Sequence, residues 1–154
     1  MSVSQQGPAL AASSTPAHRV PARIPHGLRR FTVVAGGFYL TMAGINFGLA
    51  IGNPQTYTGF ADAALFDWVR QAWLDVFMAR PVMWAGLLGA GEVLVGSALL
   101  AGGRWALAGL LAVIAFHLAL MLFGWGVALW ALPVLAVTVP VARAYLRALR
   151  QPAR

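Results

Sequence analysis

The sequence predicts an all-α, polytopic membrane protein: a four-transmembrane-helix bundle with an amphipathic interfacial helix between spans one and two. Two observations carry this prediction. Hydrophobic residues make up 60% of the 154 residues and charged residues only 10%, whereas a domain surrounded by water carries roughly 25% charge. The apolar residues also gather in uncharged segments of about 20 residues, the length that crosses a bilayer.

Four apolar segments have this length. The first, residues 31–51, holds 21 residues without a charge and is about 30 Å long at roughly 1.5 Å per residue. The others are residues 81–102, 105–123 and 127–146, with turns predicted at Gly102-Gly103-Arg104 and Gly124-Trp125-Gly126. Residues 105–142 carry no formal charge, which is too long a stretch for one span and suits two.

The two ends of the chain are predicted to be tails around a membrane domain of residues 31–146. Residues 1–30 contain prolines at positions 8, 16, 21 and 25, which interrupt any regular helix. They are expected to form a disordered cytoplasmic tail. Residues 147–154 are expected to form a short basic cytoplasmic tail.

The arginines predict the orientation. All eleven basic residues are Arg, and four spans place nine of them on one side of the membrane: Arg19, Arg23, Arg29, Arg30, Arg104, Arg143, Arg147, Arg150 and Arg154. Only Arg70 and Arg80 fall on the other side. The positive-inside rule therefore predicts a multi-pass protein of the bacterial cytoplasmic (inner) membrane with both termini in the cytoplasm. It also explains the net charge of +7 without a nucleic-acid partner.

Residues 52–80 form the only sizeable loop. In its second half Asp67, Gln71 and Asp75 recur every four residues, and apolar side chains fill the remaining positions. This pattern predicts an amphipathic helix lying in the outer membrane interface. The helix either caps the bundle or acts as a lid over a cavity that opens outward.

Glu92 is the one carboxylate inside a predicted span. An ionised carboxylate at the centre of a span costs roughly 2.5–3.5 kcal/mol on insertion scales, so Glu92 must be protonated, paired or in a wet cavity. Ala85, Gly89 and Gly96 share its helical stripe, and small residues mark contacts between helices. Glu92 is therefore predicted to face the bundle interior, either as a structural hydrogen-bonding group or as a proton-handling or ligand-binding group.

His117 and Asn46 are the other polar candidates. His117 is expected to be satisfied by a backbone carbonyl or by Glu92; no metal site is expected, because no second His or Cys stands at ligand spacing. Gly44 and Gly48 flank Asn46 as a GxxxG pair, which favours close packing. Counting residues from the outer helix ends brings Asn46, Glu92 and His117 within reach of one another, as the floor of a pocket beneath the amphipathic helix. The candidate catalytic residues are Glu92 and His117, and all three are candidate cofactor-binding residues.

The second apolar segment carries a family resemblance. It has the spacing G-x-x-E-x-x-x-G-x-x-L-L-x-G, met by Gly89, Glu92, Gly96, Leu99, Leu100 and Gly102 and followed by Arg104. Over residues 31–146 the chain resembles the DoxX-like family of four-helix membrane proteins. The resemblance implies association with membrane redox systems, such as quinone-linked thiosulfate oxidation, and partnership with soluble oxidoreductases. Asn46 stands where members of that family often have a basic residue or His.

Three functions are compatible with these features. The first is a membrane subunit associated with a redox system, which binds a quinone through Glu92 and His117 or docks an oxidoreductase partner. The alternative is a non-catalytic assembly or scaffold subunit whose small-residue faces pack against other membrane subunits. A transporter or channel is disfavoured, because the chain shows neither inverted repeats nor a ring of charges. The chain has no cysteine, which excludes thiol–disulfide chemistry and cysteine-ligated clusters.

Overall fold

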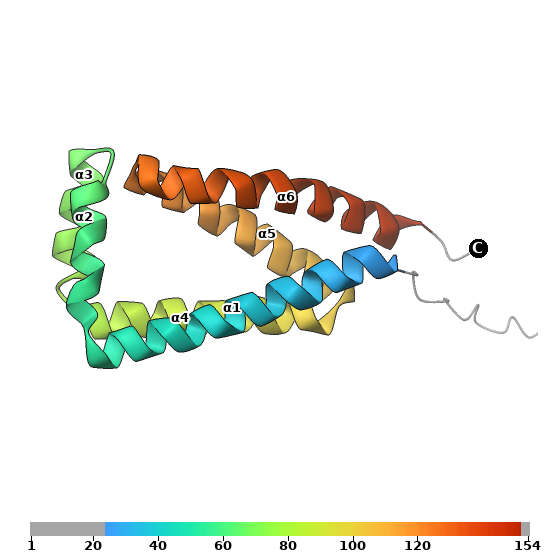
Figure 1. Cartoon of the computed structure of the whole chain (residues 1–154), viewed down its shortest axis with the longest axis horizontal. Coiled ribbons are helices and arrows are strands. Elements are labelled where there is room, and N and C mark those ends of the chain that lie inside the picture. Colours follow the sequence, from blue (N-terminus) through green and yellow to red (C-terminus); the bar gives the residue numbers. More distant parts are fainter. Residues whose placement is uncertain (1–23, 152–154) are drawn as a thin grey trace, which may run out of the picture.

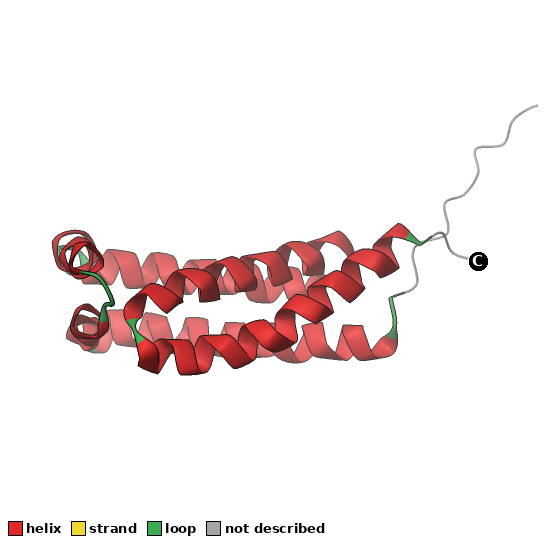
Figure 2. Ribbon diagram, turned by 90° about the horizontal axis from the view of Figure 1, so that it is seen from above, coloured by secondary structure: helices red, strands yellow, loops and turns green. Residues whose placement is uncertain are grey.

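The computed structural model describes residues 24–151, and within this range all regular secondary structure is helical. Four helices of the described range are long and apolar enough to cross a membrane. They are α1 (His26–Gly52), α4 (Pro81–Ala101), α5 (Gly103–Leu120) with the short helix η3 (Met121–Phe123), and α6 (Trp125–Arg150). The predicted four-helix membrane protein is thereby confirmed (Figure 1; Figure 2).

Two of the spans extend beyond the uncharged segments that predicted them. Helix α1 begins at His26, five residues before the predicted start, and α6 continues to Arg150, past the predicted end at residue 146. The added turns carry arginines, but their apolar residues Leu28 and Leu149 pack against the core. The predicted tails are therefore helical at residues 26–30 and 147–150, while residues 1–23 and 152–154 lie outside the described range.

Helices α1 and α4 lie side by side because glycines face each other between them. A Cβ atom added to Gly36 would lie 3.0 Å from the carbonyl oxygen of Gly96, and one added to Gly96 would lie 2.9 Å from that of Gly36. Only residues without a side chain allow two helix backbones to approach this closely. Around Gly44 and Gly48, in contrast, added Cβ atoms would meet nothing within 4 Å among the described residues. The close packing that this GxxxG pair favours is therefore not found among the described residues.

Tight glycine turns connect α4 to α5 and α5 to α6. Gly102, Gly103 and Gly124 have φ values of 81°, 53° and 97°, in the left-handed region that side chains disfavour. The Arg29 guanidinium joins α1 to the first of these turns by donating to the carbonyl oxygens of Leu99 (3.2 Å) and Leu100 (2.7 Å). The second turn is shorter than the predicted Gly-Trp-Gly sequence, since Trp125 is already the first residue of α6.

The spans form two pairs that diverge. Helix α4 lies along α1 and helix α5 along α6, and α4 and α5 meet at their glycine turn and separate toward their other ends (Figure 1). The described chain begins and ends at the end of the molecule that holds this turn. We call it the terminal end. The divergence leaves space between α4 and α5 away from the turn.

A cap segment of residues 54–77 closes the opposite end. It consists of the short helices η1 (Pro54–Thr58), α2 (Gly59–Ala63), α3 (Asp67–Ala72) and η2 (Trp73–Phe77), which lie crosswise to the spans (Figure 1; Figure 2). The predicted amphipathic segment is helical, but it forms two stretches, α2 and then α3 with η2, rather than one helix. Its break falls at residues 64–66, where the Leu65 N–H donates to the carbonyl oxygen of Leu122 at 2.9 Å. This bond links the cap segment to η3.

Candidate functional site

Helices α1 and α4 each turn one narrow stripe toward the bundle interior. The buried residues follow alternating spacings of three and four, which places them on one helix face. They are Thr32, Gly36, Tyr39, Ala43, Asn46 and Ala50 on α1, and Ala85, Gly89, Glu92, Gly96 and Leu99 on α4. The predicted interior position of Glu92 is confirmed, because its side chain is only 6% exposed.

A chain of hydrogen bonds joins the cap segment to α4 through α1. The Tyr57 hydroxyl donates to Asn46 Oδ1 at 2.5 Å, and Asn46 Nδ2 donates to Glu92 Oε2 at 2.8 Å. Tyr57 thereby fixes the orientation of the Asn46 amide, and the amide presents its N–H to the carboxyl group. The two predicted residues Asn46 and Glu92 are thus direct partners, and Glu92 is paired inside the bundle.

Tyr57 belongs to this site although it lies outside the spans. Its side chain is buried, and its backbone oxygen accepts a 2.8 Å hydrogen bond from Trp73 Nε1. Burial, and after it the nearby charge of Glu92, raises the pKa of the Tyr57 hydroxyl above its ordinary value of 10.0. The hydroxyl therefore stays protonated and remains a hydrogen-bond donor throughout the neutral range.

His117 is buried on α5 but takes no part in the hydrogen bonds that join Tyr57, Asn46 and Glu92. Its Nδ1 lies 2.9 Å from the carbonyl oxygen of Val113, one helical turn earlier. Because a carbonyl only accepts, Nδ1 carries the proton. Among the described residues no hydrogen bond connects His117 to Asn46 or Glu92, so the expectation of a backbone partner is confirmed. The structure brings together two of the three polar residues that were predicted to converge.

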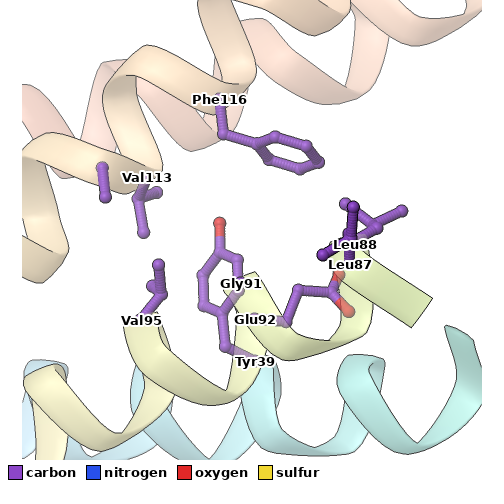
Figure 3. Close-up of a pocket in the computed structure, with 9 residues that line it drawn as sticks. Tyr39, Leu87, Leu88, Gly91, Glu92, Val95, Val113 and Phe116 are labelled. Carbon is purple, nitrogen blue, oxygen red and sulfur yellow. The ribbon is translucent and has the colours of Figure 1, made fainter. Parts of the chain in front are cut away.

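A cavity of about 240 Å³ lies between α1, α4 and α5, where the spans diverge. Glu92 and Tyr39 supply its polar side chains, and the remaining lining is glycine and apolar residues: Leu87, Leu88, Gly91, Val95, Ala112, Val113 and Phe116. Figure 3 shows the Tyr39 hydroxyl pointing across the cavity toward α5. No lining residue comes from the cap segment, which favours a capping role for that segment over a lid.

The Tyr39 hydroxyl is the unusual group of this site. The residue is 6% exposed, and its hydroxyl oxygen is buried without a hydrogen-bond partner. A buried polar group without a partner costs roughly 1–3 kcal/mol, and such groups are rare in native proteins. The cavity therefore offers a free donor beside the Glu92 carboxyl group.

Sequence reasoning did not identify Tyr39 or Tyr57. Tyr39 had a usable signal, because it precedes Asn46 by seven residues and two helical turns place both on one face. Tyr57 had none, since it lies in a short irregular segment and its contact with Asn46 depends on how the cap segment folds back. As to metals, residues 24–151 contain no group of three or more His, Asp or Glu residues able to hold an ion.

Comparison of the chain with protein-family models, with curated proteins and with solved structures finds no match. The DoxX-like resemblance therefore stays a prediction that rests on the motif around Glu92.

Proposed function

We propose that this protein is the quinone-binding membrane subunit of a redox system, with the quinone ring held in the cavity between α1, α4 and α5. One observation carries the proposal: a buried, unpartnered Tyr39 hydroxyl points into an apolar cavity beside a carboxyl group. Ligand sites are typically apolar with a few polar groups that fix orientation. A ring carbonyl oxygen is the acceptor that the Tyr39 hydroxyl lacks.

Two residues of the chain have distinct roles in this proposal. Tyr39 donates a hydrogen bond to the carbonyl and orients the ring. Glu92 is the proton-handling group, since a carboxyl group can give and take protons next to the ring and Asn46 holds it in place. A bound quinone supplies a two-electron, two-proton couple. The chain has no cysteine, so the electrons are assigned to a partner oxidoreductase rather than to thiols.

The proposed orientation in the membrane follows from the distribution of the arginines. Among the described residues, Arg29, Arg30, Arg104, Arg143, Arg147 and Arg150 lie on the helix ends and the turn of the terminal end, whereas Arg70 and Arg80 lie at the cap end. By the positive-inside rule we place the terminal end in the cytoplasm and the cap segment on the outer face of a bacterial inner membrane.

A scaffold subunit is the second candidate. It is favoured by the Asn46–Glu92 hydrogen bond, which gives Glu92 a partner without any ligand and joins two helices as polar pairs in membranes do. It leaves the Tyr39 hydroxyl unexplained. The two candidates differ in whether the purified protein binds a quinone.

The test replaces Tyr39 by Phe, which removes only the unpartnered hydroxyl. Because that hydroxyl has no partner in the free protein, Tyr39→Phe should leave the thermal stability in detergent unchanged or raise it. Its affinity for decylubiquinone, measured by titration calorimetry, should fall by roughly fivefold, the equivalent of about 1 kcal/mol for one hydrogen bond.

Tyr145→Phe is the matched control. The Tyr145 hydroxyl is also buried and without a partner, but Tyr145 lies near the terminal end of α6 and does not line the cavity. It should show the same stability effect and bind decylubiquinone like the wild type. A wild-type protein that binds no decylubiquinone would support the scaffold instead, and equal binding by all three proteins would remove Tyr39 from the site.

A further inference from the structure

A groove continues the cavity toward the terminal end. It has a volume of about 470 Å³ and runs between α4 and α5 from Leu94 to Ala101 on one side and from Ala112 to Trp105 on the other. Val95 and Ala112 line both the cavity and the groove, so the two adjoin each other. At about 1.5 Å per residue, the α4 side of the groove is about 10 Å long.

The groove is open on the outer surface of α4 and α5, which would face lipid in a membrane. Its floor consists mainly of small residues, and its flanking side chains Leu94 and Trp105 are 72% and 58% exposed. Along this length the lining contains no ionisable side chain. Ser97 is the one polar side chain in the lining, so a hydrocarbon chain in the groove would contact mainly apolar side chains.

The cavity alone is too small for a complete lipid-soluble ligand. Its volume of about 240 Å³ lies below the roughly 300–1,000 Å³ typical of ligand sites, whereas cavity and groove together fall within that range. Tyr39 and Glu92 lie at the cavity end, and Ser97 is the one polar side chain of the groove. This division matches a molecule with one polar end and one hydrocarbon end.

Building on the proposed quinone function, we infer that the groove between α4 and α5 holds the hydrocarbon tail of the ligand, which enters sideways from the bilayer. The ligand class is then a tailed quinone rather than a free ring. A transmembrane helix of another chain could also cover small residues, but it would leave the Tyr39 hydroxyl in the cavity without an acceptor. The groove adjoins the cavity through Val95 and Ala112, which favours the tail.

The experiment compares two probes that share a ring: decylubiquinone, which carries a ten-carbon tail, and ubiquinone-0, which carries none. The wild type should bind decylubiquinone at least about tenfold more tightly. Ala108→Trp places a bulky side chain at an exposed position of the groove. It should remove the advantage of the tail and leave the affinity for ubiquinone-0 unchanged.

The control is Ala136→Trp, the same substitution at an exposed position of α6 that lines neither the cavity nor the groove. It should bind both probes like the wild type. Ala101→Trp, at another exposed groove position, serves as the test variant if Ala108→Trp fails to fold. Calorimetric titration and size-exclusion chromatography in detergent are run on each protein.

The outcomes separate the two proposals. If the wild type binds neither probe, the quinone function itself is refuted, and the tail site with it. Equal wild-type affinities for the two probes, or a tail advantage that survives Ala108→Trp, would overturn the tail site while the quinone function stands. If Ala108→Trp keeps both affinities but changes the oligomeric state seen by size-exclusion chromatography, the groove is a contact between chains and the tail site is overturned.

Discussion

At the residue scale, the Asn46–Glu92 hydrogen bond determines what a substitution of Glu92 does. In Glu92→Gln the side-chain carbonyl can still accept from Asn46 Nδ2, so the unfolding temperature in detergent should stay near that of the wild type. In Glu92→Leu the buried amide loses its acceptor, and we expect a loss of roughly 1–3 kcal/mol. Thermal denaturation of both variants distinguishes these effects. Equal destabilisation by Gln and Leu would show that the charge of Glu92, not its acceptor, holds α4 to α1.

Glu92→Gln also tests proton transfer. Glu92→Gln keeps the hydrogen bond to Asn46 but has no exchangeable acidic proton. A well-folded Glu92→Gln protein should therefore lose quinone-linked turnover in membranes. Full turnover in that variant would remove the proton-handling role from Glu92.

At the scale of the helices, the crossing of α1 and α4 depends on Gly36 and Gly96. We expect Gly96→Val to force the backbones apart, because its Cβ would lie 2.9 Å from the Gly36 carbonyl oxygen. Overpacking of this kind typically costs about 1–3 kcal/mol. Gly44→Val, which meets open space on α1, has the same helix-propensity effect without the clash. A difference between the two variants in unfolding temperature measures the packing, and the absence of a difference would contradict the close approach.

At the scale of the whole molecule, the proposed orientation predicts which residues reach the outer solution. The natural chain has no cysteine, so single cysteines can be introduced as unambiguous probes. A membrane-impermeant maleimide added to intact spheroplasts should label Gln55→Cys, which lies in the cap segment. It should label Gln151→Cys, at the end of α6, only after the membrane is opened. The reverse labelling pattern would overturn the orientation.

The local sequence was sufficient to predict the four spans, the crosswise amphipathic segment and the interior position of Glu92. Each of these depends on properties of one segment: its length, its lack of charge, or the small residues that share a stripe with Glu92. The segment boundaries were less predictable, since turns that carry Arg29 or Arg147 also bury apolar neighbours and stay helical.

The cavity required the packing of helices that are distant in sequence. Residue depth alone placed Asn46, Glu92 and His117 together, but the His117 side chain bonds to the backbone of its own helix, and the divergence of α5 from α4 opens the space that Tyr39 faces. The arrangement of the spans depends on close backbone contacts between them, here Gly36 against Gly96, and on the Gly102–Gly103 turn. Such contacts leave no periodic signal within a single segment. The free Tyr39 hydroxyl and the groove beside the cavity could therefore not be predicted from the sequence and are seen only in the folded bundle.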